Sequence, residues 1–292
     1  MDEATAPLTI REPSAAELAR ALSLFQHLPP PPEAWLLVAV RTLPIQRFVA
    51  ASAAWRKGEV GQFRLACRPG VARPAVAAPF IARIEQAARS TGTRILEYAE
   101  LLAEENEWSS LLLEQGFTWR RSERFFEVST VRAYERVMRM AAAYMDDVPK
   151  SWHAESIRQH RPETVVGLVA QHRLLPLAEL QQYWRPDFPF GFDLDLSAIL
   201  FDGPQPIGTL LLRRSPEAYI VDVRVVAQEN PRLRGLGNLC LFRHVAQHGD
   251  PLGPIRCLQF RGGEAEHRET AHLALRMGGR ELAPRRIMGK QL

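Results

Sequence analysis

The pattern of hydrophobic and polar positions along this chain predicts two successive sets of helices and strands. The first set predicts strand, helix, three strands, helix, strand, helix and a last pair of strand segments. Ser14 and Glu17 have the spacing of a capping box, and Pro79 suits the first turn of a helix. The expected elements are residues 8–11, 15–25, 34–41, 47–55, 62–67, 79–90, 95–99, 104–115 and 117–128.

A second set of similar order follows an amphipathic helical pattern at residues 130–145. Matching Ala75 with Gly235 and Gly116 with Gly278 gives offsets of 160 and 162 residues, which indicates a duplication. We predict an N-terminal domain of residues 1–129, a helical connector of residues 130–150 and a C-terminal domain of residues 151–292. The expected elements of the second set are residues 154–158, 164–172, 178–184, 196–201, 206–213, 218–227, 238–248, 255–260 and 268–276.

The segment Arg232-Leu233-Arg234-Gly235-Leu236-Gly237 lies between a strand-like run and a helical run. This order predicts a strand, a tight basic loop and a helix that begins at about residue 238. The two glycines let the backbone approach a ligand closely, and the start of a helix offers unpaired N–H groups. With two arginines beside them, these features predict a phosphate site, and a pyrophosphate suits it best.

Three interpretations compete for this segment. The first is a surface turn, and the second is a dinucleotide-binding loop. A dinucleotide site needs a parallel strand–helix–strand unit and a third glycine, and here three antiparallel strands are expected before the loop and Cys240 holds the third position. The third interpretation is a resemblance, because Arg232, Gly235 and Gly237 match the Q/R-x-x-G-x-G/A signature of the GNAT (GCN5-related) N-acetyltransferases.

The resemblance covers nearly the whole chain as a tandem pair. Residues 67–85 resemble the central motif of the family, and residues 107–117 are similar to its helix that ends in Gly-Phe. It implies an α/β (α+β) fold of two tandem GNAT-like domains, each a mixed, mostly antiparallel sheet flanked by helices. It also implies an N-acetyltransferase that moves an acetyl group from acetyl-CoA to the amine of a small molecule or peptide, without a metal.

The residues that the resemblance assigns to the CoA site lie around the glycine segment. They are Val225, Val226, Ala227, Arg232, Leu233, Arg234, Gly235, Leu236, Gly237 and Asn238. In the first half the signature positions read Ala72, Ala75 and Ala77, and Pro74 removes an N–H donor. We therefore expect the first half to keep the architecture and to have lost the anion site.

Asp222, within an apolar run before the glycine segment, is the expected general base, and Glu217 is the second choice. The alternative for Asp222 is a solvent-facing position or an ion pair with Arg213 or Arg224. The tyrosine that the family often uses as general acid aligns with Ala274. His267, or else His272, is expected near the thiol end of the cofactor and is a candidate acid.

Two further segments carry side chains of chemical interest. The aromatic stretch 183–192 falls where the family's substrate-covering loop would lie, so it is a candidate wall for an apolar amine, with Asp187 or Asp193 to attract the ammonium. The alternative is that the stretch packs over the core. His244 and His248 are four residues apart on a helix, but without a third ligand a solvated helix face is the better interpretation.

Composition narrows the classes of protein. The chain has 292 residues, 46% hydrophobic and 24% charged, which suits a globular protein of two domains. No apolar run is long enough to span a membrane, the N-terminus has no signal-peptide pattern, and three cysteines outside metal spacing favour a reduced, cytoplasmic setting.

The net charge of +4 is spread over isolated arginines, which argues against a nucleic-acid partner. The acceptor amine and the length of the acyl chain stay open, and so does the oligomeric state, for which a homodimer is an alternative. A second functional class also stays open: an inert GNAT-like binding or scaffold protein that binds at most CoA.

Overall fold

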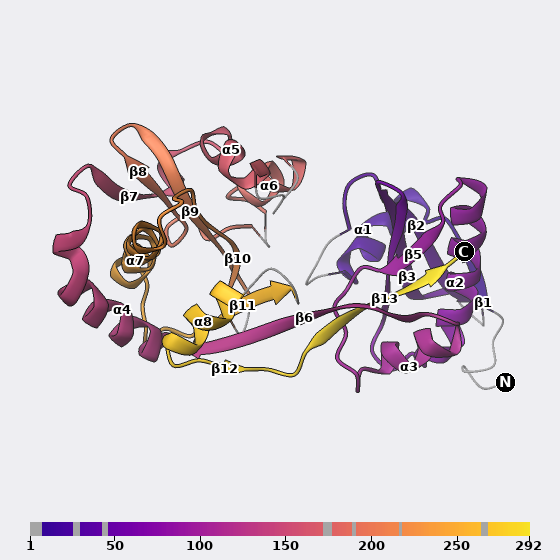
Figure 1. The fold of residues 1–292 in the computed structure, drawn as a ribbon. Coiled ribbons are helices and arrows are strands. Elements are labelled where there is room, and N and C mark those ends of the chain that lie inside the picture. The colour runs from indigo at the N-terminus through magenta and orange to yellow at the C-terminus, as the bar shows by residue number, and fades with distance from the viewer. Residues whose placement is uncertain are drawn as a thin grey trace. The chain divides into compact units, whose positions relative to one another are not determined.

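The computed structural model describes residues 8–25, 30–42, 46–171, 177–188, 191–215, 218–263 and 268–292. These residues form two compact units (Figure 1). The first unit comprises residues 1–123 and 284–292, and the second comprises residues 124–283. Each unit has a mixed sheet with helices on both faces, as the resemblance implied.

The sheet of the first unit has the strand order β1-β2-β3-β4-β5-β13-β6. Neighbours are antiparallel except for β4 and β5, which run parallel. The strands are β1 (Leu8–Arg11), β2 (Trp35–Thr42), β3 (Gln46–Lys57), β4 (Val60–Cys67), β5 (Ile95–Tyr98), β6 (Thr118–Ser129, of which residues 118–123 belong here) and β13 (Arg285–Gln291).

Helices cover the two faces of this sheet. On one face α2 (Arg73–Ser90) and α3 (Glu107–Glu114) pack over a core that includes Phe63 and Leu96. On the other face α1 (Ala15–Ser23) packs over small and aliphatic side chains. The predicted capping box of α1 is confirmed, because the Ser14 N–H and hydroxyl both donate to Glu17. Hydrogen bonds from Arg11 and Ser14 hold the pKa of Glu17 at about 2.

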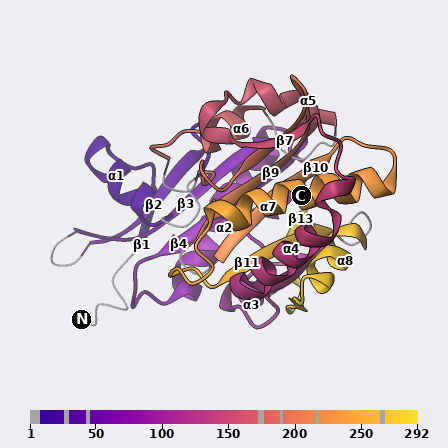
Figure 2. The ribbon, with the colours of Figure 1, turned by 90° about the vertical axis from the view of Figure 1, so that its left-hand side faces the viewer.

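The second unit repeats this plan with the strand order β7-β8-β9-β10-β11-β6, and β12 pairs with the other edge of β6. Figure 2 shows α7 and α4 along one face of its sheet and α5 and α6 on the other. The elements are α4 (Thr130–Tyr144), β7 (Trp152–Ser156), α5 (Glu163–Gln171), α6 (Leu177–Tyr183), β8 (Ala198–Asp202), β9 (Gln205–Arg214), β10 (Ala218–Val226), α7 (Pro231–His248), β11 (Cys257–Gly263), α8 (Arg268–Arg276) and β12 (Arg280–Glu281), with 3₁₀ turns at Met145–Asp147 and Ile157–Gln159.

The two units divide the chain at other places than the expected boundaries at residues 129 and 151. The last strand of the chain, β13, lies between β5 and β6 in the first unit. The second half of β6 lies beside β11 in the second unit, and α4, expected as a connector, packs there against α7. Pairing between distant segments decides which neighbour a strand has in the sheet, and the local pattern of hydrophobic and polar residues does not predict that neighbour.

Two helices begin earlier than the sequence indicated. Helix α2 starts at Arg73 rather than at Pro79, and α7 starts at Pro231 rather than at residue 238. In each case a proline lies in the first turn, where its missing N–H costs nothing, and Pro79 is tolerated inside α2. Pro79 and the two glycines are therefore interior positions of these helices and do not mark where they begin.

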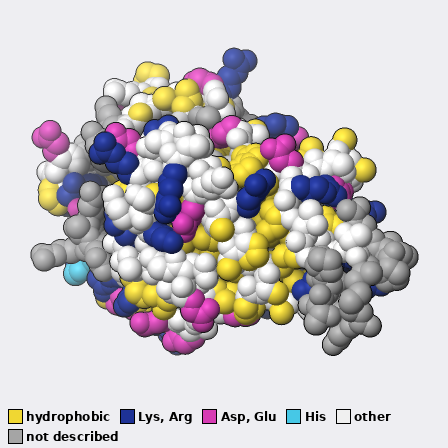
Figure 3. Space-filling model, turned by 90° about the vertical axis from the view of Figure 1, so that its right-hand side faces the viewer, with side chains coloured by type: hydrophobic (Ala, Val, Ile, Leu, Met, Phe, Trp, Pro, Cys, Tyr) yellow, Lys and Arg dark blue, Asp and Glu magenta, His cyan; other side chains and the backbone are white. Residues whose placement is uncertain are grey.

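The surface in Figure 3 carries hydrophobic side chains over its middle, with Lys and Arg interspersed among Asp and Glu. In the first unit the exposed large hydrophobic residues are Leu18, Leu22 and Leu113. No field of a single charge covers this face of the described part of the chain.

The C-terminal strand is expected to stabilise the first unit. Met288 is fully buried in its core, so Met288→Ala should lower the free energy of unfolding by about 2–5 kcal/mol through loss of burial and a residual cavity. Gln291→Ala, at an exposed position of the same strand, should change it by less than about 0.5 kcal/mol. Urea denaturation followed by circular dichroism measures both, and equal effects would contradict this role of β13.

Candidate functional site

The parallel ladder between β10 and β11 stops after four residue pairs. Residues 218–221 pair with residues 257–260, and among the described residues no further ladder pair joins the two strands. Both strands continue beyond this point, to Val226 and Gly263. Within the part of the chain that the structure describes, the end of β10 therefore has no strand partner on that side, and such an edge can accept an extended, amide-bearing ligand.

A β-bulge follows directly after the ladder. On β9, Leu212 and Leu211 are consecutive, but their partners on β10 are Val221 and Val223, so Asp222 is the extra residue. The bulge shifts the alternation of side chains by one position. Val221 packs in the core under α7, whereas Val223 packs in the core under α5.

Because of this shift, Arg224 faces α7 and α8. Its Nη1 donates to Asn238 Oδ1 over 2.9 Å, and its Nη2 donates to Thr270 Oγ1 over 3.2 Å. The Asn238 amide in turn donates to the Arg234 carbonyl, and the Arg234 guanidinium lies 3.2 Å from Glu269. Burial lowers the pKa of Arg224, which the charge of Glu269 opposes and that of Arg234 reinforces.

The glycine segment is helical rather than a loop. Asn230 is the N-cap of α7, and its side chain accepts the N–H groups of Arg232 and Leu233 at 2.8 and 3.4 Å. The Arg234 N–H donates to the Asn230 carbonyl. The expected row of free loop amides is therefore absent from these three residues, because Asn230 and Pro231 together start the helix before the glycines.

The two glycines of this segment have different surroundings. A Cβ on Gly237 would lie 2.7 Å from Val226 and 3.1 Å from Leu200, so this glycine allows α7 to approach the sheet. A Cβ on Gly235 would meet no heavy atom within 4 Å. Packing within the protein therefore explains Gly237 and leaves Gly235 without a structural requirement.

The arginines of the segment already have acidic partners. The Arg232 guanidinium, 74% exposed, lies 3.0 Å from Asp147, as Arg234 lies near Glu269. Both pairs are open to solvent, where an ion pair contributes little and exchanges readily. The two side chains remain accessible to an anion at the start of α7.

Asp222 forms an ion pair with Arg213, which is one of the alternatives predicted for it. Its two carboxylate oxygens accept from Nε and Nη2 of Arg213, and the guanidinium lies 5.2 Å from the Tyr183 ring centroid. The Asp222 side chain is 10% exposed. Glu217 and His267 lie outside the described residues.

His272 and Ala274 lie on α8. His272 is exposed, and Ala274, at the position of the family's tyrosine, is fully buried. The side chains that sequence reasoning missed are Arg224 and Thr270. A charged residue in the middle of a strand buried on both faces was the available signal for Arg224.

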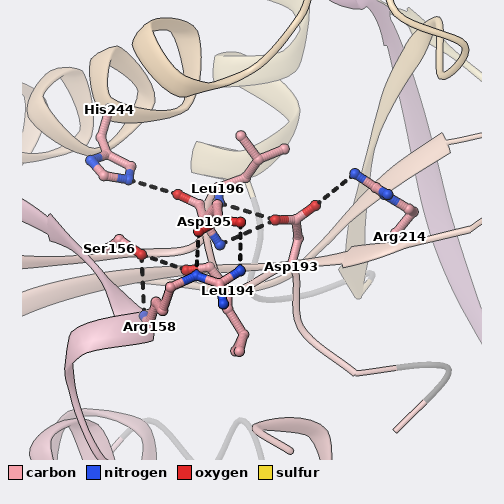
Figure 4. Close-up of polar contacts among 8 residues, drawn as sticks. All are labelled: Ser156, Arg158, Asp193, Leu194, Asp195, Leu196, Arg214 and His244. Atoms are coloured by element: carbon pink, nitrogen blue, oxygen red, sulfur yellow. Dashed lines mark hydrogen bonds and ion pairs between the residues drawn. The ribbon is translucent and has the colours of Figure 1, made fainter. Parts of the chain in front are cut away.

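The acidic residues of the aromatic segment are occupied by other partners. Asp187 pairs with Arg185 on the surface. Asp193 accepts the N–H groups of Asp195 and Leu196 and lies 3.2 Å from Arg214 (Figure 4). It therefore closes the turn before β8, and this role explains its position without an ammonium ligand.

The aromatic side chains of this segment pack together in the second unit. Tyr183 and Trp184 make edge contacts with Phe192, and Tyr183 also contacts Phe188. Trp184 and Phe192 are buried in the core under α5. This arrangement matches the alternative interpretation, a segment packed over the core, for these two residues, while Tyr183 covers Arg213.

The paired histidines of α7 have structural partners. His244 Nε2 donates to the Asp195 carbonyl over 3.0 Å (Figure 4). His248 Nδ1 donates to the His244 carbonyl. Burial lowers the pKa of His244. Within the described ranges no group of three His, Cys, Asp or Glu residues could hold a metal ion. No described helix is both long and apolar enough to pass through a bilayer.

The corresponding place in the first unit differs in three ways. The ladder of β3 and β4 runs without a register shift, so β4 has no bulge. The N-cap of α2 is Ala72, whose side chain accepts no hydrogen bond, and Pro74 follows in the first turn. In the last pair of the parallel ladder, the fully buried Tyr98 on β5 packs against Phe63 and Trp108.

Comparisons with known proteins agree with this architecture. No protein-family model and no curated protein matches the sequence. Among solved structures, a tandem GNAT protein from the clavulanic acid biosynthesis pathway is 14% identical, with a TM-score of 0.65 over 98% of both chains.

Two further structures show the same likeness. A GCN5-related N-acetyltransferase from Sphaerobacter thermophilus is 13% identical, with a TM-score of 0.56 over 98% of this chain and 97% of the other. One from Kribbella flavida is 12% identical, with a TM-score of 0.56 over 100% and 73%. At these identities the likeness establishes the fold, and the chain has the tandem GNAT fold.

The contrast between the two glycines can be tested by stability. Gly237→Ala should destabilise the protein by about 1–3 kcal/mol, because its methyl group overlaps Val226. Gly235→Ala is the matched control and should stabilise by up to about 1 kcal/mol, because alanine is the better helix former and has room. Thermal denaturation of both variants measures the difference; a loss of stability in Gly235→Ala would show that this position is packed.

Proposed function

We propose that this protein is an acyltransferase of the N-acetyltransferase type, which transfers an acetyl group from acetyl-CoA to an amine. The observation that carries the proposal is the open end of β10 beside the start of α7. There an unpaired strand edge, the positive end of a helix and the open side of Gly235 occur together. The tandem GNAT fold supports it.

In this proposal CoA binds the second unit. The diphosphate lies at the start of α7, where it replaces the Asn230 side chain as the acceptor of the Arg232 and Leu233 N–H groups. It also accepts hydrogen bonds from the guanidinium groups of Arg232 and Arg234. The pantetheine amides lie along the end of β10, and Gly235 provides room for the backbone to approach. The residues expected at CoA are Val225, Val226, Ala227, Arg232, Leu233, Arg234, Gly235, Leu236, Gly237 and Asn238.

The bound thioester would supply an activated acyl group, and the chain's own residues would prepare the amine. Asp222 lies at the bulge after the ladder, so it is the carboxylate placed to accept the proton of an ammonium substrate. Arg213 fixes the orientation of its two oxygens. A base held in one orientation can act through a water molecule, which would bridge the carboxylate and the amine.

The ion pair also favours a second candidate function. Both Asp222 oxygens are engaged by Arg213, so this carboxylate is not free in the described structure. A protein that binds CoA without turnover, as a scaffold or carrier, would have the same site. Turnover assays distinguish the two candidates, because both share the affinity for CoA.

The first unit is proposed to bind no CoA. It lacks the bulge, its helix α2 starts without a side-chain cap, and Arg73 is engaged by Glu107 at 2.8 Å and by the Trp108 ring. A diphosphate there would lose water and gain few donors. The first unit would instead have a structural role, and β13 completes its sheet.

Calorimetric titration with acetyl-CoA should therefore give one molecule bound per chain. Gly235→Val should reduce the affinity at least about tenfold, because its side chain fills the open volume beside the backbone. The control is Ala75→Val on α2, at the position of the first unit that matches Gly235. Two molecules per chain, or equal affinity in Gly235→Val, would overturn the assignment.

Asp222→Asn should lower kcat by about 10²–10⁴ and leave the affinity for acetyl-CoA unchanged, because a base acts on the amine. The assay follows release of the CoA thiol with a panel of arylalkyl amines and aliphatic amines. Asp187→Asn, which removes an exposed carboxylate of the same charge, is the control. Unchanged turnover in Asp222→Asn excludes it as the base, and no turnover in the wild-type protein favours the binding function.

A further inference from the structure

Arg224 carries a partly buried guanidinium with which no acidic side chain of the described residues forms an ion pair. Its two hydrogen-bond partners, Asn238 and Thr270, are neutral. Among the described residues no carboxylate forms an ion pair with it, because Glu269 pairs with Arg234. A guanidinium has five N–H donors, so three remain for another acceptor.

The position of this charge is built by the fold. The bulge at Asp222 turns Arg224 toward α7 and α8, beyond the last pair of the parallel ladder. Burying a cation among neutral groups is costly, and an anionic ligand removes that cost. Burial also lowers the pKa of Arg224, so its surroundings favour a negative partner.

The depth of Arg224 indicates which part of a CoA thioester it would meet. Its partner Asn238 lies seven residues after Pro231, which is about 10 Å along the helix axis. A diphosphate at the first turn of α7 would therefore lie about 10 Å from Asn238 along the helix axis. The guanidinium is therefore placed toward the acyl end of the ligand, past the phosphates.

We infer that Arg224 selects an acyl donor whose acyl chain ends in a carboxylate, such as a succinyl or malonyl thioester, over acetyl-CoA. The inference rests on the proposed binding of CoA in the second unit. The carboxylate would accept hydrogen bonds from the remaining guanidinium donors, and a planar guanidinium matches both of its oxygens. Asn238 and Thr270 would hold the guanidinium in place.

The test is the ratio of affinities for succinyl-CoA and acetyl-CoA, measured by calorimetry. The wild-type protein should prefer succinyl-CoA, and Arg224→Gln should reduce that preference by about 10- to 100-fold, the usual range for a charged hydrogen bond. Arg224→Lys should retain part of it. Arg280→Gln, an arginine on β12 with a 75% exposed side chain, is the control and should change nothing.

A second variant leaves Arg224 in place. Thr270→Asp puts a carboxylate where the threonine hydroxyl accepts from Arg224, in the first turn of α8, where an acidic residue is favourable. It should neutralise the guanidinium and remove the preference as Arg224→Gln does. Melting temperatures of all variants identify any that fail to fold, so Thr270→Asp keeps the test decisive if Arg224→Gln unfolds.

Each other outcome is decisive. Equal weakening of CoA, acetyl-CoA and succinyl-CoA in Arg224→Gln would place the guanidinium at the diphosphate and overturn the inference. No preference in the wild-type protein, or a preference unchanged in both variants, would overturn it while the proposed function stands. If no CoA compound binds the wild-type protein, the proposed function fails and this inference fails with it.

Discussion

The short parallel ladder in the middle of each sheet is the constraint around which each unit is arranged. Two parallel neighbours require a crossover, and α2 in one unit and α7 in the other lie in that crossover. Each ladder ends after four pairs, and the strands beyond it differ between the units. In the second unit the extra residue Asp222 turns β10 directly after the ladder, whereas in the first unit β4 continues in register beside β3. Tyr98, in the last pair of that ladder, packs into the core.

The strand that covers the far edge of each ladder comes from a distant part of the chain. Beside β5 lies β13, the last strand, and beside β11 lies the second half of β6. An uncovered edge would present unpaired N–H and C=O groups, so each unit gains by this pairing. Lys290 of β13 adds hydrogen bonds to Glu85 and to the Gln115 carbonyl. The sheet of the first unit is thus continuous between β5 and β6 only with β13 in place.

The two charged side chains at the bulge have opposite surroundings. Asp222 is matched by Arg213, a bidentate partner on the neighbouring strand. Arg224, two residues further along, is held by an amide and a hydroxyl. A buried charge that is matched orders the structure, whereas one held by neutral dipoles still attracts an ion of opposite sign. This difference underlies the separate roles proposed for the two residues, one toward the amine and one toward the acyl donor.

The sequence by itself determined what depends on neighbouring residues. The alternation of side chains predicted most strands, the Ser14–Glu17 spacing predicted the cap of α1, and the glycine signature indicated the GNAT fold, because each of these is local. The early start of α7 was missed because Asn230 and Pro231 outweigh two glycines. Only tertiary structure decided that β13 completes the first unit and that Arg224 faces α7 and α8, because both depend on pairing between distant strands.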